Sequence, residues 1–392
     1  MLAVFRRHAI LTVFTIVAIV LVLIGWWVRP DVELAPATRP EDSVMPAPDS
    51  GPGDDGAESR STSTGDSGPC NIEREWLAVE NFDDALETYR TQVEALGKFA
   101  EVAMVGSKNA DEIVFAASFS EGRARLDQYS SAIDDGLRSP YLLWKAVISC
   151  IDHIKDGGKC PIDDWFEMLS TYDAENSEVW MQLAGYRFQQ GDHRAGMAAL
   201  ERAANATGTN GYWSRDLEVY TNGLVASGAF DRYDALGYAF GLSASSLPSY
   251  KLHADTCIDT KMTDARRLDW CEQYARNALS RPTTLLSQSI AESILRFVHE
   301  ARGETDAAAA IQAKKRQRNI DALNNVPREQ ARMIFLRQHP ELMDVYVSEI
   351  ETRGEEEAML RHRQRIDEAG LDAFMTRCRN ELAAYAEAVR ST

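Results

Sequence analysis

Proline and histidine are both scarce in most of this sequence. Only six of the thirteen prolines lie beyond residue 70, and the seven histidines form no HExxH motif. A zinc site built on that motif is therefore excluded. Glycine-rich phosphate-binding loops and the GxSxG elbow of serine hydrolases are also absent. We therefore expect no metal, no cofactor and no local catalytic motif.

Positive charge is scarce as well. Lysine and arginine number 42 against 60 acidic residues, which gives a formal net charge of −18. Such a chain is repelled by nucleic acids and by anionic lipids. Basic clusters at 314–318 and 361–365 are local exceptions with helical spacing, typical of solvated helix faces. We expect no nucleic-acid partner.

Long apolar runs are confined to the N-terminus. Residues 9–28 (AILTVFTIVAIVLVLIGWWV) carry no charge, and a helix of this length spans roughly 30 Å of hydrocarbon. Arg6 and Arg7 precede the run and an acidic segment follows it, which favours an N-terminus in the cytoplasm. The exit IGWWVRP lacks the small residues of a cleavage site, so an uncleaved signal-anchor is favoured over a cleaved signal peptide.

This reading predicts a single-pass protein of the inner (cytoplasmic) membrane. Residues 1–8 are the short cytoplasmic N-terminus, 9–28 the transmembrane anchor helix, and the C-terminal domain lies in the periplasm. A eukaryotic secretory lumen gives the same topology. Residues 29–70 hold seven prolines and many Ser, Gly and Asp residues, too polar a composition to bury a core. They predict a disordered linker with a reach of roughly 35 Å.

Beyond the linker, apolar residues recur at spacings of three and four, as in Phe82, Leu86, Tyr89, Val93 and Leu96. This periodicity predicts an all-α domain. One run, 113–119 (IVFAASF), is the exception that resembles a strand. We expect N-terminal helices at 71–138, a helical-repeat array at 139–325 and C-terminal capping helices at 326–392.

Breaks between the expected helices recur every 34 to 39 residues. A period of this length is typical of stacked helical hairpins, each of which needs its neighbours to bury an apolar face. The breaks are Gly157-Gly158, Gly191-Asp192, Gly228, Thr263-Asp264 and Gly303.

One unit, residues 176–208, has the clearest pattern of large and small residues, with Asn176 as its candidate N-cap. The residues of that pattern are Trp180, Leu183, Ala184, Gly191, Gly196, Leu200 and Ala203. With these residues the unit resembles the tetratricopeptide repeat. It departs from the family at Arg187, where an aromatic residue is usual, and at Gly208, where a proline is common.

The resemblance implies an α-solenoid, a right-handed superhelical array of antiparallel helical hairpins. In that family, the first helices of successive hairpins line a groove that binds an extended peptide or a partner's helix. The corresponding positions are Met181, Gly185, Phe188 and Gln189. Met181 and Phe188 suit core contacts between hairpins equally well.

The six cysteines all follow the apolar run, on the side where disulfides persist. Residues equidistant from the turn of a hairpin face each other, and two pairs satisfy this condition. Cys150 and Cys160 are centred on residue 155, while Cys257 and Cys271 are centred on residue 264. We predict these two disulfides. Cys70 and Cys378 either pair with each other or link two molecules, and buried free thiols are the alternative for all six.

These features predict a membrane-anchored adaptor or scaffold that binds another envelope protein or peptide, with a homo-oligomer also possible. The alternative is a glycan-cleaving envelope enzyme. Lytic transglycosylases combine a helical superhelix with a Glu-Ser motif, and Glu292-Ser293 lies in a helical segment. The rest of that family's pattern is missing, so we expect no enzymatic activity.

Overall fold

The domain consists of α-helices joined by short turns. The computed structural model describes residues 91–379 except 93, 101, 103–106, 121, 246–249, 259–263, 282–283, 325–327, 329–330, 333–334, 337–338 and 340. The described residues form no β-strand beyond one isolated bridge, between Asn176 and Gly208. The run at 113–119, which resembles a strand, lies mostly within helix α3. The named helices are α3 (Ala110–Ser118), α4 (Gly122–Asp134), α5 (Pro140–Lys155), α6 (Ile162–Tyr172), α7 (Ser177–Gln189), α8 (His193–Asn205), α9 (Trp213–Ala226), α10 (Arg232–Ser245), α11 (Tyr250–Cys257), α12 (Ala265–Leu279), α13 (Leu285–Ala301), α14 (Thr305–Asn324), α16 (Glu341–Arg353), α17 (Glu355–Glu368) and α18 (Leu371–Arg377).

The helices end where the sequence predicts breaks. Gly157, Gly191 and Gly303 follow α5, α7 and α13 with φ values of 83°, 78° and 76°. In each case the glycine N–H and the next N–H bond back to carbonyls of the last helical turn. This is the Schellman arrangement, which needs a left-handed residue that glycine adopts without a Cβ clash. The hairpin turns are therefore fixed locally.

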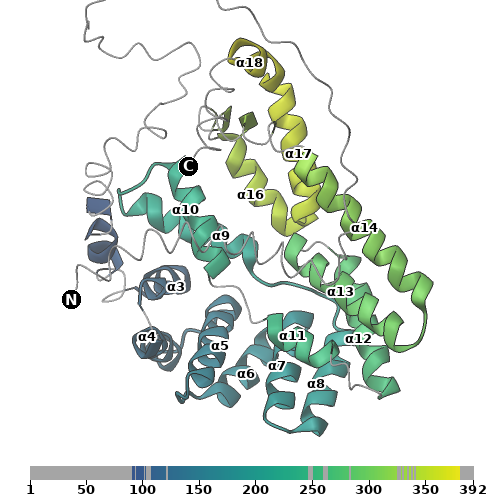
Figure 1. Cartoon of the computed structure of the whole chain (residues 1–392). Helices are drawn as coiled ribbons and strands as arrows, with labels where there is room; N and C mark the ends of the chain where they lie inside the picture. The colour runs from purple at the N-terminus through teal and green to yellow at the C-terminus, as the bar shows by residue number, and fades with distance from the viewer. Residues whose placement is uncertain are drawn as a thin grey trace, which may run out of the picture. The chain divides into compact units, whose positions relative to one another are not determined.

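The hairpins do not stack in chain order. The α7–α8 hairpin packs on α11 and α12, and α13 and α14 continue from α12. The α9–α10 hairpin instead packs on α3 and α16, apart from α7 and α8 (Figure 1). The continuous array predicted for 139–325 is therefore interrupted by this hairpin.

Two glycines explain this arrangement. A Cβ atom on Gly185 of α7 would lie 2.7 Å from Cβ of Leu252, so only glycine lets α11 approach so closely. A Cβ atom on Gly223 of α9 would lie 2.4 Å from the ring of Phe115 in α3. Close-packed helices cannot absorb such overlaps without moving apart. The two glycines thus favour the packing of α7 on α11 and of α9 on α3.

The buried core forms three clusters. One cluster, which includes the fully buried Trp144, joins α3, α4, α5 and α6 to α9, and it also contains Tyr186 of α7 and Leu252 of α11. A second cluster, with Met181 and Leu200, fills the space between α7, α8, α12 and α13. The C-terminal helices have a smaller cluster around Phe374. Expected as a cap, they form an α16–α17 hairpin that packs on α9.

Both predicted disulfides are present. Cys150 in α5 is bonded to Cys160, with Cα atoms 6.0 Å apart, and Cys257 at the end of α11 is bonded to Cys271 in α12, with Cα atoms 5.6 Å apart. Closing loops of this size stabilises a fold by roughly 2–3 kcal/mol each. Cys378 is also disulfide-bonded, whereas Cys70 lies outside the described residues.

The predicted membrane anchor at 9–28 and the linker at 29–70 also lie outside the described residues. Within the part of the chain that is described, every helix is too short or too polar to cross a bilayer.

Candidate functional site

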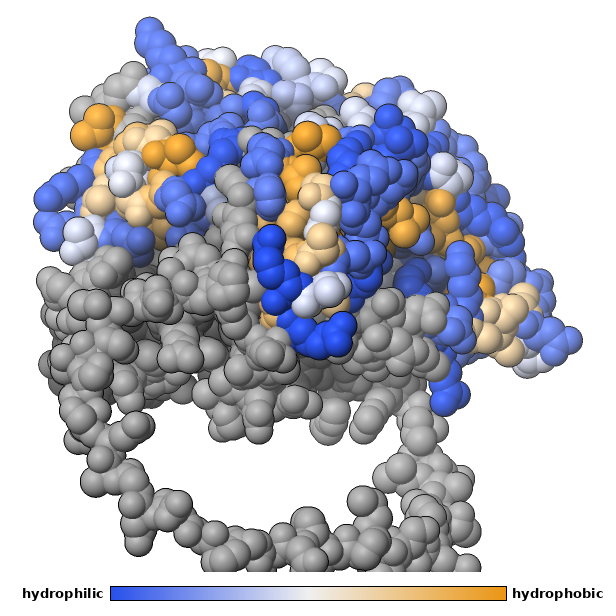
Figure 2. All heavy atoms as spheres, turned by 90° about the horizontal axis from the view of Figure 1, so that it is seen from above, coloured by the Kyte–Doolittle hydropathy of each residue, from blue (hydrophilic) through white to orange (hydrophobic). Residues whose placement is uncertain are grey.

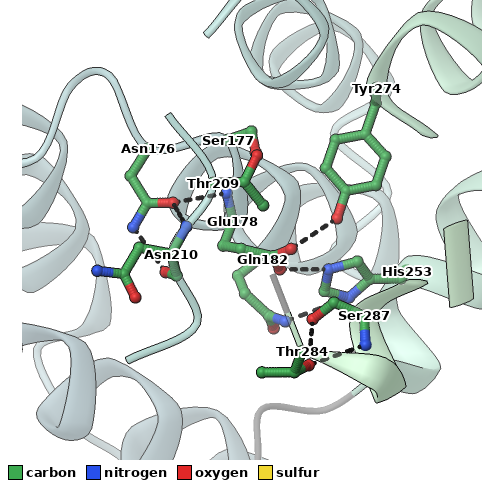
Figure 3. Close-up of polar contacts among 10 residues, drawn as sticks. All are labelled: Asn176, Ser177, Glu178, Gln182, Thr209, Asn210, His253, Tyr274, Thr284 and Ser287. Atoms are coloured by element: carbon green, nitrogen blue, oxygen red, sulfur yellow. Dashed lines mark hydrogen bonds and ion pairs between the residues drawn. The ribbon is translucent and has the colours of Figure 1, made fainter. Parts of the chain in front are cut away.

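A group of buried polar side chains surrounds Glu178 (Figure 3). Glu178 lies in the first turn of α7, where the positive end of the helix dipole favours a carboxylate. The Asn176 side chain caps this helix by accepting a hydrogen bond from the Glu178 backbone N–H at 3.1 Å, as the sequence predicts. Glu178 is only 2% exposed, so its charge needs partners within the protein.

Two helices, α11 and α12, supply those partners. The Tyr274 hydroxyl of α12 donates to Oε1 of Glu178 at 2.9 Å, and Nε2 of His253 in α11 lies 2.8 Å from Oε2. Nε2 of Gln182, one turn further along α7, lies 3.3 Å from Nδ1 of His253. With the proton on Nε2, the imidazole donates to Glu178 and accepts from Gln182.

Burial also fixes the protonation of the tyrosines. Burial raises the pKa of Tyr274 well above its usual range, and the Glu178 carboxylate raises it further. The same two causes raise the pKa of Tyr250, whose ring lies 5.3 Å from that of His253. Both phenols therefore stay protonated, and Tyr274 remains a hydrogen-bond donor to the carboxylate.

The cluster is closed to solvent. His253 is fully buried and Tyr274 is 2% exposed. A general acid or base must reach its substrate within hydrogen-bond distance, and among the described residues these side chains bond to one another. The Glu178 cluster, defined here as Glu178, Gln182, His253 and Tyr274, therefore joins α7, α11 and α12 rather than forming an accessible reaction centre.

Two capping loops flank the Glu178 cluster in Figure 3. On one side, Asn176 Oδ1 accepts from the Asn210 N–H at 2.9 Å, while its Nδ2 donates to the Asn210 carbonyl at 2.8 Å. On the other side, Thr284 caps α13 by accepting from the Ser287 N–H at 3.0 Å. Glu355 of α17 also accepts from the Leu285 N–H at 2.8 Å. The ends of α7 and α13 are thus held by residues distant in sequence.

A second buried group ties α9 to α5. The Lys145 ammonium lies 2.5 Å from Oδ2 of Asp216, and the Tyr141 hydroxyl donates to Oδ1 at 2.7 Å. Lys145 and Asp216 are 3% and 2% exposed. A buried pair of this kind is costly to break, because the remaining charge stays desolvated. It supports the placement of α9 beside α5 and α3.

The candidate Glu-Ser motif has a structural role of the same kind. Glu292 is 4% exposed, and Arg318 of α14 binds both of its carboxylate oxygens, at 3.0 and 2.7 Å. Ser293 donates to the Ser289 carbonyl within its own helix at 2.8 Å. Glu292 therefore joins α13 to α14, and its carboxylate is occupied by the guanidinium.

The four predicted partner-binding residues face α11 and α12 within the same chain. Met181 is fully buried, and Gly185 lies against Leu252. Phe188 lies under the Arg267 guanidinium, 4.3 Å from the ring centroid, and Gln189 donates to Asp255 at 3.3 Å. Met181 and Phe188 thus form contacts between hairpins, the reading that the sequence left open for them, while Gln189 is exposed. Partner binding at these positions stays a prediction.

Sequence reasoning missed the Glu178 cluster and the Lys145–Asp216 pair. One signal was available for the first, since Glu178, Met181, Gln182 and Gly185 share one face of α7 at helical spacing. Polar groups among apolar residues on one face indicate buried hydrogen bonding. Their partners lie more than 70 residues away, and no local pattern indicates them.

Among the described residues, no group of three His, Cys, Asp or Glu side chains is placed to bind a metal ion. Comparison with protein-family models finds no match. Neither a curated protein nor a solved structure is significantly similar to the chain.

Proposed function

We propose that this protein is a membrane-anchored helical-repeat adaptor that binds a partner protein or peptide in the cell envelope. The observation that carries the proposal is the pair of disulfides within an all-α stack of hairpins. Disulfides persist in oxidising compartments. Stacked hairpins offer extended surfaces for protein binding. The apolar run at 9–28 would anchor the domain on the exported side.

The polar interior supports an adaptor rather than an enzyme. Glu178, Asp216 and Glu292 are the buried carboxylates considered above, and each is bound by side chains of another helix. Their interactions hold the stack together. The glycan-cleaving alternative would need Glu292 as an acid, whereas Arg318 binds both of its oxygens.

We also propose that the hairpins follow the right-handed superhelix of tetratricopeptide proteins, with α9–α10 as a branch. The packing of α7–α8 on α11–α12 supports this arrangement. Exposed apolar residues on the face shown in Figure 2 lie in separate groups between hydrophilic ones. Separate groups suit a partner that binds with contacts from several helices.

Topology reporters test the placement. Alkaline phosphatase, which is active only outside the bacterial cytoplasm, is fused after residue 392, and β-galactosidase is fused there in a parallel strain. We expect phosphatase activity alone. Galactosidase activity alone would disprove the exported location. In the same strain, Glu292→Gln should leave peptidoglycan turnover unchanged, and a loss of turnover would favour the enzyme.

A further inference from the structure

Among the residues that the structure describes, helix α14 packs on the domain with one of its sides. Its main neighbour is α13 (Figure 1). Ala308, Ile311, Lys315 and Arg318 are buried or half-buried. The opposite side is exposed. We call it the outer face of α14, and it consists of Ala309, Ala310, Gln312, Ala313, Lys314, Arg316 and Gln317.

The shape of the outer face suits another helix. Ala309 and Ala313 are four residues apart, so they lie in one row along the helix, and Gln317 continues that row. Small side chains let a second helix approach toward the lower end of the usual interaxial range of about 8–10 Å. Lys314 and Arg316 flank the row on its two sides.

Beyond the first turn of α14, where Asp306 is exposed, the outer face carries positive charge that the described residues do not neutralise by ion pairs. Lys314 and Arg316 are exposed, and neither forms an ion pair with another described residue. Lys315, at the inner edge, donates to the Ser293 hydroxyl at 3.3 Å rather than to a carboxylate. This local excess contrasts with the net charge of −18 for the whole chain.

The titration of Lys315 supports this picture. Burial lowers the pKa of Lys315, and Arg318 and Arg296 lower it further, while Glu292 opposes them. Arg318 already binds Glu292, and Arg296 is paired with Glu300 at 3.3 Å. The neighbouring carboxylates are thus engaged with these two arginines.

We propose that the outer face of α14 is the docking surface for an acidic helix of a partner protein. The inference rests on the proposed adaptor function and specifies the chemistry of its partner. An alanine row flanked by Lys314 and Arg316 matches a helix that carries small residues along one stripe and Asp or Glu beside it. Charge complementarity of this kind increases association rates and selects the partner.

A direct binding test uses the full-length protein in detergent. The probe is a fluorescent 21-residue synthetic helix built from the repeat Glu-Ala-Ala-Leu-Glu-Ala-Ala, and the control probe has lysine in place of glutamate. We expect the acidic probe to bind in a salt-sensitive way and the basic probe not to bind. The double variant Lys314→Glu with Arg316→Glu should weaken binding about tenfold or more.

A matched variant separates local from overall charge. Lys108 and Arg194 are exposed on other helices or loops and form no ion pair with a described residue. Lys108→Glu with Arg194→Glu changes the net charge by the same amount and should leave binding within about twofold. Equal weakening by both double variants, or no binding of the acidic probe, would overturn the docking proposal.

Photo-crosslinking in native membranes distinguishes this proposal from the adaptor function itself. A photoreactive residue is placed at Ala313, and in a second strain at Tyr172, which is 52% exposed on α6. We expect an adduct from Ala313 with an acidic segment of another protein. This adduct should be lost in Lys314→Glu with Arg316→Glu and kept in Lys108→Glu with Arg194→Glu.

Adducts from Tyr172 and none from Ala313 would overturn the proposed docking surface on α14 but would remain consistent with the adaptor function. No protein adduct from either position would count against both. An adduct between Ala313 and a second copy of this chain would indicate self-association instead of binding to a partner protein. That result would also overturn the proposal.

Discussion

His253 and Glu178 lie 75 residues apart in sequence, yet Nε2 of the imidazole is 2.8 Å from the carboxylate in a region closed to solvent. This contact joins α7 to α11, although the α9–α10 hairpin lies between them in the sequence. The Tyr274 hydroxyl adds α12 to the same carboxylate. One side chain therefore holds three helices of the stack, and its removal should affect all of them.

Replacement of Glu178 should destabilise the domain strongly. Glu178→Gln keeps the size of the side chain but replaces one acceptor oxygen by an NH₂ donor. That donor then lies opposite the donor group of His253 or Tyr274. We expect a loss of about 2–4 kcal/mol in the free energy of unfolding, measured by urea denaturation. Glu201→Gln, at an exposed position on α8, is the control and should change stability by less than about 0.5 kcal/mol.

The Lys145–Asp216 pair should show strong coupling. Lys145→Met removes the cation bound to the buried Asp216 carboxylate, so we expect a loss of about 3–5 kcal/mol. The double variant Lys145→Met with Asp216→Leu should recover much of that loss, because both charges of the pair are then removed. For comparison, Arg123→Met breaks an exposed pair with Asp127 and should cost less than about 1 kcal/mol. Additive losses in the double variant would contradict a role in charge compensation.

His362 should make the domain sensitive to acid. His362 is 7% exposed, its ring stacks on Tyr346 with centroids 4.8 Å apart, and neither ring nitrogen has a hydrogen-bond partner among the described residues. Burial lowers its pKa to about 4, and Arg365 and Arg332 contribute to the shift. The folded state thus binds this proton less readily than the unfolded chain, whose histidine pKa is about 6.5.

The stability due to neutral His362 is therefore complete above pH 6.5 and is lost as the pH falls toward 4. With allowance for solvent screening, we expect this loss to be on the order of 2 kcal/mol. His362→Phe should flatten the profile between pH 6.5 and 4, as measured by urea denaturation at several pH values. His193→Asn, at an exposed position, should leave the slope intact. An unchanged slope in His362→Phe would contradict the prediction.

The disulfides should be recovered from native protein. Peptide mapping without reduction should yield the pairs Cys150 with Cys160 and Cys257 with Cys271. These four cysteines form two pairs, and Cys378 is also disulfide-bonded. We therefore expect a third disulfide between Cys378 and the remaining cysteine, Cys70. Alkylation of Cys150 or Cys257 before reduction would contradict the first two pairs, and a dimer linked through Cys378 would contradict the third.

Local chemistry explains what could be predicted. Gly157, Gly191 and Gly303 end helices because a left-handed residue satisfies the last carbonyls of the preceding turn. Asn176 begins α7 because its side chain accepts from the Glu178 N–H. The run at 113–119 shows the limit of such reasoning. Its apolar residues suit a strand, but Asn109 caps a helix there, and Val114 and Phe115 are buried against other helices.

The sequence by itself determined the helical class, the positions of the hairpin turns and the two short disulfides. Each depends on residues within about fifteen positions of one another. Only the tertiary structure decided that α9–α10 leaves the stack and that Glu178 meets His253. Every amphipathic hairpin presents a similar apolar stripe, and that stripe does not specify its neighbour. Shape and buried charge decide which hairpins pack together. The contacts are Gly185 with Leu252, Gly223 with Phe115 and Lys145 with Asp216. They form only when the whole chain has packed.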